Sequence, residues 1–327
     1  MASKNLSRLF PPRLIDRLTE LADIDTRRVL GDFDQPGAAQ VLATAEVLIT
    51  GWGCPPIDRK VLDAAPRLRA VLHAAGTVRG LVTESCWERG LVVTSAAQAN
   101  AVPVAEYTLA AILLAGKDAF VLRATPNEEG RDPRDGDGRP AALGNYRRRV
   151  GVIGASRVGR RLLDLLRPFD FAVALSDPYA EPVEAAQLGA TLLPLDDLLR
   201  DSDIVTLHAP SLPQTRHLLD RRRLALIPDG ATVINTSRGA LIDPAALTDE
   251  LVSGRLNAVL DVTEPEPLPP DSPLHRLPNV FLTPHIAGSL GNELERLGAA
   301  VVDELERLVG GLPLRHRVLR SDLDRVA

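Results

Sequence analysis

Three short segments in the second half of the chain contain polar residues that strand packing does not require. They carry Arg238, Asp261, Glu266 and His285, and each segment follows or closes an apolar run. Guanidinium, imidazole and carboxylate groups are side chains that bind small anions and transfer protons. In an open parallel sheet the strand ends face one crevice, so these four residues can converge although they are far apart in the sequence.

A glycine-rich turn precedes these segments. Residues Gly154 to Gly159 read Gly-Ala-Ser-Arg-Val-Gly, the Gly-x-Gly-x-x-Gly dinucleotide fingerprint with Ser156 at its middle position. Gly154 supplies the tight turn and Gly159 the close packing of helix on strand, while the helix N-terminus offers free N–H groups to phosphates. We expect Ser156 to keep a negative φ and turn its side chain aside, where the hydroxyl can bond a phosphate oxygen. Taken alone, the motif also fits a simple strand-to-helix connection.

A carboxylate at the end of the next strand makes the nucleotide interpretation more specific. Asp177 lies about 20 residues beyond the glycine turn, where an acidic residue bonds the adenosine ribose hydroxyls. A carboxylate in this place repels the 2′-phosphate of NADP, and no arginine directly follows it to compensate. NAD is therefore the expected cofactor.

The order of apolar runs predicts the elements that hold these residues. From residue 149 onward short β-rich runs alternate with helical ones, and each strand-like run is apolar on both faces. Such runs belong in a parallel sheet that helices cover on both sides. The sequence therefore predicts an α/β protein whose second half is a doubly wound Rossmann domain.

The first half repeats the alternation more weakly and predicts a second doubly wound domain, of flavodoxin-like type. Its strands are expected at 46–51, 68–74 and 91–95, with helices at 58–65 and 84–89. The chain lacks a convincing strand before residue 14.

An apolar run at 102–114 predicts a long helix. The segment at 125–145 is rich in glycine, proline and charge and predicts an exposed loop, so the two together suit a crossing between domains. A final amphipathic stretch at 292–308 can return the chain to the first domain. The predicted substrate domain comprises 1–118 plus 289–327, and the cofactor domain inserted into it comprises 119–288.

Composition and charge argue against several classes of protein. The 327 residues are 45% hydrophobic and 25% charged, as in a globular protein of two domains. A formal net charge of −5 argues against a surface that neutralises nucleic-acid phosphates. No apolar run reaches the roughly 20 residues of a membrane span, and the N-terminus lacks the apolar core of a secretory signal. Cys54 and Cys86 have neither CxxC nor metal-ligand spacing, so we expect no metal site and a reducing cytoplasm.

Several motifs in a fixed order resemble the D-isomer-specific 2-hydroxyacid dehydrogenase family. They are LRAVLHAAGT, the helix opening VPVAE, the glycine turn, LHAP, NTSRGALID, LDVTEPEP and LTPHIAG, and the resemblance runs from about Glu46 to Gly310. The family includes D-3-phosphoglycerate dehydrogenase, D-lactate dehydrogenase and the glyoxylate/hydroxypyruvate reductases. The resemblance implies hydride transfer between NADH and a small 2-oxo acid, giving a D-2-hydroxy acid or running in reverse, and it implies a homodimer.

The resemblance also implies three catalytic roles. Arg238 corresponds to the arginine that binds the substrate carboxylate and polarises the reacting carbonyl, a task suited to a planar guanidinium. His285 corresponds to the histidine that protonates the carbonyl oxygen, and Glu266 to its carboxylate partner, which favours the imidazolium. Glu264 is expected to be an exposed loop acid.

Cofactor and substrate positions follow from the same resemblance. Asp261 corresponds to the residue that anchors the nicotinamide carboxamide. The expected cofactor-binding residues are Gly154, Ser156, Arg157, Val158, Gly159, Asp177, His208, Ala209, Pro210, Thr215, Thr236, Arg238, Asp261, His285 and Gly288. The substrate carboxylate is expected on the backbone of a loop in the first domain, and the full substrate-binding set is Gly53, Ala75, Gly76, Thr77, Arg238 and His285.

The substrate loop departs from the family pattern, because Val78 and Arg79 stand where a polar Asp-Asn pair is usual. Arg79 is favoured as a surface arginine, with contact to a second anionic group of the substrate as the alternative. Trp52 is equally consistent with a pocket wall and with simple packing. His73 is favoured as a packed strand residue rather than a ligand.

Other functions on the same fold remain open at this point. A non-catalytic NAD(H) sensor resembling the family's corepressors is the main alternative, and turnover of 2-oxo acids separates it from an enzyme. Oxidation of formate or phosphite is a third possibility. The pair of Glu266 and His285 fits hydroxy acids better than formate, and Ala75 stands where phosphite enzymes have a lysine.

Overall fold

The computed structural model describes residues 1–123 and 143–323, and its contacts divide the chain into two compact units. Unit 1 comprises Met1–Val102 and Ser289–Ala327, and unit 2 comprises Pro103–Gly288. The first crossing falls inside helix α6 (Ala97–Ala115), whereas the sequence analysis placed it after residue 118, because the helix passes through the crossing without a break. Nearly all of the segment predicted to be an exposed connection, 125–145, lies outside the described residues.

Unit 2 contains a seven-stranded sheet in the order β10-β9-β8-β7-β4-β5-β6, with every pairing parallel. The chain runs outward from β4 through β6 and then returns to the other side of β4 for β7, which is the reversal of a Rossmann sheet. The sequence did not single out β6. The strands are β4 (Arg149–Ile153), β5 (Ala172–Ser176), β6 (Thr191–Leu192), β7 (Ile204–Leu207), β8 (Thr232–Asn235), β9 (Asn257–Leu260) and β10 (Val280–Leu282).

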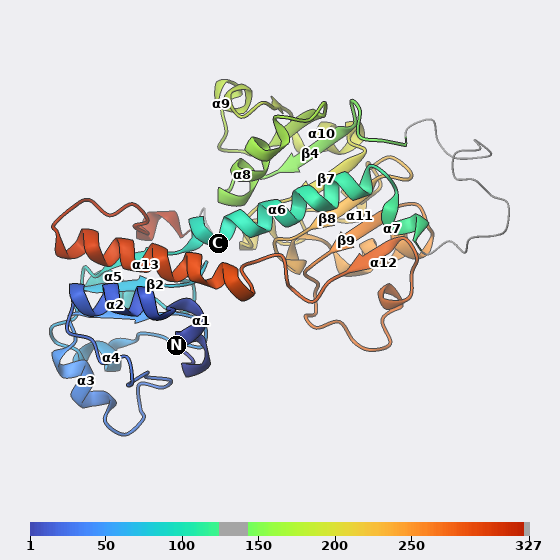
Figure 1. The fold of residues 1–327 in the computed structure, drawn as a ribbon. Coiled ribbons are helices and arrows are strands. Elements are labelled where there is room, and N and C mark those ends of the chain that lie inside the picture. Colours follow the sequence, from blue (N-terminus) through green and yellow to red (C-terminus); the bar gives the residue numbers. More distant parts are fainter. Residues whose placement is uncertain (124–142, 324–327) are drawn as a thin grey trace. The chain divides into compact units, whose positions relative to one another are not determined.

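Helices cover both faces of this sheet, because successive strand residues point to opposite sides. Ile204 packs in the core cluster that contains Ile112 of α6, whereas its neighbour Val205 packs in the cluster on the α12 face. Figure 1 shows α6 lying along the sheet. The helices of unit 2 are the end of α6, α7 (Ala119–Leu122), α8 (Arg157–Leu166), α9 (Pro182–Gln187), α10 (Leu195–Asp201), α11 (Arg221–Leu224) and α12 (Pro244–Val252).

Unit 1 contains a parallel sheet whose described strands follow chain order, β1-β2-β3. This is the ascending half of a flavodoxin-like order, and no described strand lies on the outer side of β1. The residues before position 14 form short helical segments and no strand, in agreement with the lack of a strand pattern there. The strands are β1 (Val47–Thr50), β2 (Ala70–His73) and β3 (Val92–Ser95).

Two apolar clusters lie on the two faces of the unit 1 sheet. Val71 packs with α4 and α5, whereas Leu72 packs with the terminal helices, of which α2 and α13 lie side by side (Figure 1). Both units are thus α/β layers built on parallel strands, as predicted. The helices are α1 (Leu6–Leu9), α2 (Pro12–Leu21), α3 (Ala38–Thr44), α4 (Arg59–Ala64), α5 (Glu84–Glu88), the start of α6 and α13 (Leu294–Val309).

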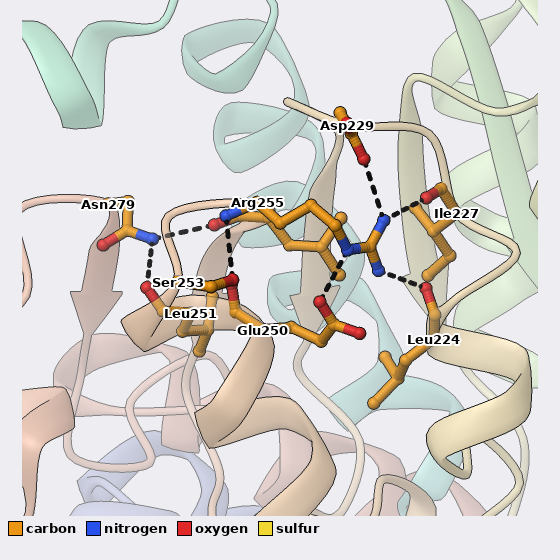
Figure 2. Close-up of polar contacts among 9 residues, drawn as sticks. Leu224, Ile227, Asp229, Glu250, Leu251, Ser253, Arg255 and Asn279 are labelled. Atoms are coloured by element: carbon orange, nitrogen blue, oxygen red, sulfur yellow. Dashed lines mark hydrogen bonds and ion pairs between the residues drawn. The ribbon is translucent and has the colours of Figure 1, made fainter.

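An arginine secures the turn between α12 and β9, at the amino end of the unit 2 sheet. Arg255 donates to the carbonyl oxygens of Ile227 (2.6 Å) and Leu224 (2.7 Å) and to the Glu250 carboxylate (2.5 Å), as Figure 2 shows. Asn279 donates to two more carbonyls beside this turn. These contacts fix one end of the strands, while the polar residues singled out above follow the other end.

Within residues 1–123 and 143–323, no helix combines the length and apolar character needed to cross a membrane.

Candidate active site

The glycine turn of unit 2 approaches other backbone too closely for side chains. Gly154 has φ of +99°, and a Cβ there would lie 2.7 Å from the Ala209 nitrogen and 2.8 Å from the His208 carbonyl carbon. A Cβ on Gly159 would overlap the carbonyl oxygen of Gly154. Glycine is therefore required at both positions, and the turn leaves bare backbone at the start of α8.

Ser156 caps the helix that follows this turn. Its φ is −67°, as expected for a residue with a side chain, and its hydroxyl accepts a hydrogen bond from the Gly159 nitrogen at 3.3 Å. Arg157 and Val158 form the first turn of α8. The serine thus satisfies one of the N–H groups that the first turn of a helix leaves without an intrahelical partner.

Asp177 lies directly after β5 and reaches back to the glycine turn. One carboxylate oxygen accepts from the Ala155 nitrogen at 2.6 Å, and the other accepts from the Tyr179 nitrogen at 2.8 Å. These two hydrogen bonds hold the Asp177 carboxylate beside the glycine turn. The two are close because β5, which Asp177 follows, is the neighbour of β4, which the turn follows.

The loop after β7 forms the other side of this region. His208 is buried, and its Nε2 pairs with the Thr206 hydroxyl at 2.9 Å. Burial lowers the pKa of His208 to about 3, so the ring is neutral at physiological pH. Its Nδ1 has no hydrogen-bond partner among the described residues. Thr215 closes the loop, because its hydroxyl donates to the Pro210 carbonyl at 2.5 Å and accepts from the Leu212 nitrogen at 2.8 Å.

These features fit a bound dinucleotide. The bare turn and the N-terminus of α8 suit a pyrophosphate, the Asp177 carboxylate suits ribose hydroxyls, and the buried Nδ1 of His208 is a polar atom that a ligand can satisfy.

The turn after β8 presents Arg238. The Asn235 side chain accepts from the Ser237 nitrogen (3.0 Å) and donates to the Arg238 carbonyl (2.9 Å), which fixes the backbone of the turn. Thr236 is buried, and its hydroxyl pairs with that of Thr108 on α6 at 2.9 Å. The Arg238 guanidinium is exposed and donates to the Ser237 carbonyl at 2.6 Å.

Asp261 follows β9 and organises the segment after β10. The buried carboxylate accepts from the Thr283 hydroxyl (2.6 Å) and from the nitrogens of Ile286 (2.8 Å) and Ala287 (2.9 Å). Its carbonyl accepts from the nitrogen of His285, which has φ of +55°. Asp261 therefore binds the residues on both sides of His285, and these contacts hold His285 in an uncommon backbone conformation.

The imidazole of His285 contacts Glu266. Nδ1 and the carboxylate oxygen are 2.6 Å apart, and the two side chains are 48% and 42% exposed. Strands β8, β9 and β10 are neighbours in the sheet and run parallel, so their carboxyl ends lie at the same end of the sheet. The residues that follow these strands are, in the same order, Arg238, Glu266 and His285. Gly288 is the last residue of unit 2.

The residues predicted to form the substrate loop belong to unit 1 and follow β2. His73, the last residue of β2, is buried and pairs through Nδ1 with the Thr50 hydroxyl at 2.8 Å. Burial, followed by the nearby N-terminal ammonium, lowers its pKa to about 4. Ala75 is buried and Gly76 is partly exposed, while the Thr77 hydroxyl accepts from the nitrogen of Arg79 at 3.2 Å. The histidine is thus a packed strand residue, as favoured from the sequence.

The loop after β1 holds two further residues of interest from the sequence. Gly53 has φ of +77°, and the Trp52 side chain is 41% exposed. The backbone carbonyl of Trp52 accepts from the nitrogen of Ala2.

Several residues that the sequence analysis did not assign to the site support it. The Tyr107 hydroxyl on α6 pairs with the Thr283 hydroxyl at 2.7 Å, which extends the contacts of Asp261 into the core. The expectation that Glu264 is an exposed loop acid was wrong, because its side chain is only 31% exposed and pairs with Arg216 at 2.8 Å. Tyr107 lies five residues after Val102 in a continuous apolar helix, so only its hydroxyl hints at a role.

The chain is similar to known proteins over most of its length. Residues 126–287 match the family model described as "D-isomer specific 2-hydroxyacid dehydrogenase, NAD binding domain". The chain is 34% identical over 256 residues to D-3-phosphoglycerate dehydrogenase of Mycobacterium bovis, covering 78% of this chain and 48% of that protein. It is 31% identical over 258 residues to glyoxylate reductase of Korarchaeum cryptofilum, covering 76% of each.

A solved structure extends the likeness to both units. The TT0316 protein from Thermus thermophilus has a TM-score of 0.75 and 30% identity, covering 95% of this chain and 98% of that one. The chain spans about half the length of the D-3-phosphoglycerate dehydrogenases that it matches. With a Rossmann unit, an NAD-binding match and a relative covered over three quarters of its length, the chain belongs to the D-isomer-specific 2-hydroxyacid dehydrogenase family.

Proposed function

We propose that this protein transfers hydride between NADH and a small 2-oxo acid, giving a D-2-hydroxy acid or running in reverse. The main observation in its support is the 2.6 Å contact between Glu266 and His285, at the carboxyl end of the strands, where Arg238 also lies. The relatives named D-3-phosphoglycerate dehydrogenase and glyoxylate reductase support the same chemistry.

In the proposed mechanism the protein binds the acid, orients its carbonyl and supplies the proton. The Arg238 guanidinium of unit 2 binds the carboxylate and polarises the carbonyl. Ala75, Gly76 and Thr77 of unit 1 are proposed as the substrate loop, through their backbone N–H groups. Because Glu266 occupies Nδ1 of His285, the opposite ring nitrogen, Nε2, is the one that delivers the proton to the carbonyl oxygen. The bound nicotinamide supplies or accepts the hydride.

The cofactor is assigned to unit 2 and the substrate loop to unit 1. The residues proposed to hold NAD are those of the glycine turn, Asp177, the loop from His208 to Thr215, Thr236, Asp261 and Gly288. Asp261 already accepts three hydrogen bonds, and its carboxylate oxygens have capacity for the amide of a nicotinamide in addition. Asp177 selects NAD over NADP because it would repel a 2′-phosphate.

Two broader properties are also proposed. The free thiols of Cys54 and Cys86 are consistent with a reducing cytoplasm. A homodimer is proposed from the family, whose members resemble this chain over both units.

A substrate panel tests the function. NADH oxidation is measured with glyoxylate, pyruvate, hydroxypyruvate, phosphohydroxypyruvate and phosphonopyruvate. We expect turnover with at least one acid, and Arg238→Ala should raise its KM as well as lower kcat because the carboxylate loses a charged bidentate partner. Absence of turnover with all five acids, together with tight NADH binding, would instead favour a sensor.

A further inference from the structure

The loop that carries Glu266 borders an open pocket of about 390 Å³, which is also lined by Ile242, Leu247 and Leu260. Leu268 anchors the far part of the loop, because it packs against the core of unit 2. Glu266 itself is exposed and does not line the pocket, so apolar packing does not fix its side chain. Its position therefore depends on the specific contacts that the neighbouring loop residues make.

One of those contacts is made by Glu264, two residues before Glu266. Its Oε1 accepts from the guanidinium of Arg216 at 2.8 Å. Its Oε2 lies 3.6 Å from Nε2 of His217, and both atoms are buried without a hydrogen-bond partner among the described residues. The Glu264 side chain is 31% exposed, so two basic residues surround one half-buried carboxylate.

Arg216 and His217 directly follow the loop from His208 to Thr215, on which the cofactor is proposed to bind. The His217 nitrogen donates to the Ala240 carbonyl at 2.8 Å, which joins this loop to the turn after Arg238. Glycine at 239 lets that turn approach the Thr263 carbonyl more closely than any side chain would permit. Glu264 thus lies where three loops, those after β7, β8 and β9, meet.

We propose that Arg216 and Glu264 form a positioning pair that holds Glu266 on Nδ1 of His285. The proposal rests on the proposed function, and neither member of the pair is required to touch substrate. An exposed ion pair adds little to global stability. Here, however, the pair fixes a loop that carries a catalytic carboxylate, and a displacement of about 1 Å in such a group can cost roughly 100-fold in rate.

The direction in which the titration midpoint of His285 moves distinguishes a positioning role from a direct effect of the Arg216 charge. Removing the Arg216 cation with Arg216→Gln would, as a purely electrostatic effect, favour the protonated imidazole of His285 and move its titration midpoint to higher pH. Loss of the Glu266 contact has the opposite effect, because the imidazolium loses its carboxylate partner. We therefore expect Arg216→Gln to lower the midpoint.

The midpoint is measured by NMR of the His285 ring in protein without cofactor, assigned by comparison with His285→Gln. This readout does not depend on turnover. In the pH–rate profile, kcat/KM at neutral pH should fall roughly 10- to 100-fold, and Arg216→Lys should restore part of the loss. Glu264→Asp keeps the charge but shortens the reach, so it should lower the midpoint too, and it serves as the test should Arg216→Gln not fold.

Arg222→Gln is the matched control. Arg222 pairs with Asp196 at 2.7 Å, with side chains 57% and 33% exposed, against 54% and 31% for Arg216 and Glu264. The control should leave both the midpoint and kcat/KM unchanged. A midpoint that stays constant or rises in Arg216→Gln, with Glu264→Asp unchanged, would overturn the positioning role. Failure of the wild type to reduce any acid would count against the proposed function while leaving the titration result intact.

Discussion

Glu266 and His285 lie 2.6 Å apart through Oε1 and Nδ1, although they are on loops that follow two different strands, β9 and β10. The contact depends on two supports. Asp261 holds the backbone on both sides of His285, and Glu264 connects the Glu266 loop to Arg216. Each support gives the proposed acid and its partner a defined geometry before substrate arrives.

Replacing Glu266 by glutamine tests the role of its charge. A neutral amide of similar shape no longer favours the imidazolium, so the pH above which reduction falls off should move downward. The measurement is kcat/KM for a 2-oxo acid across pH, and Glu250→Gln, which removes a carboxylate at the opposite end of the strands, is the control. An unchanged profile in Glu266→Gln would show that this carboxylate does not support the proton donor.

Replacing Asp177 by alanine tests the choice of cofactor. The wild type should strongly prefer NADH, and Asp177→Ala should narrow the preference because the repulsion of a 2′-phosphate is removed. The ratio of kcat/KM for NADH to that for NADPH reports the effect directly. A wild type that works better with NADPH, or a ratio that the substitution does not change, contradicts the assignment of Asp177 to the ribose.

The strands and the glycine turn were predictable from the sequence because short apolar runs in a parallel sheet are buried on both faces and interrupted by helices. The contact of Glu266 with His285 came from the family resemblance, and the structure places the two groups together. The supports were not predictable in the same way. Glu264 and Arg216 are ordinary surface residue types, and their pairing depends on how two separate loops fold.

The structural contacts of Asp261 were not predicted. Asp261 was assigned to the nicotinamide, whereas its hydrogen bonds to Thr283, Ile286 and Ala287 show that it also builds the His285 segment. The sequence does not specify such contacts, because a backbone N–H group is the same in every residue type except proline. The division of the chain inside α6 was missed for a similar reason, since a helix that crosses between units keeps its periodicity.

Two buried histidines predict how stability depends on pH. Burial lowers the pKa of His208 to about 3 and that of His73 to about 4, from an ordinary value of 6.5. The unfolded chain therefore binds protons below pH 6.5 that the folded chain does not, and stability should fall as pH drops from about 6.5 toward 4. The loss should approach about 2 kcal/mol per histidine between pH 7 and pH 5.

Urea unfolding at several pH values measures this loss. The variants His208→Gln and His73→Gln should each reduce the dependence on pH in this range. A free energy of unfolding that is constant between pH 7 and pH 5 in the wild type would contradict the neutral, buried state of both rings.

The contacts of Arg255 are expected to contribute substantially to the free energy of unfolding. Arg255→Ala leaves the carbonyls of Leu224 and Ile227 and the 17%-exposed Glu250 carboxylate without their donor, and it should cost about 2–4 kcal/mol. Arg221→Ala is the comparison, because its pair with Asp249 is 64% and 62% exposed and should contribute less than about 1 kcal/mol. Equal losses from the two variants in thermal or urea unfolding would contradict this ranking.

The proton donor is the centre of the proposed mechanism, and single-variant kinetics test it most directly. The measurement is kcat for NADH-dependent reduction of the best 2-oxo acid by wild type and by His285→Ala, with the Kd for NADH determined alongside. Loss of a general acid predicts a fall in kcat of roughly 10²- to 10⁴-fold, while NADH binding stays nearly intact. Near-normal turnover by His285→Ala would mean that another group supplies the proton and would contradict the mechanism.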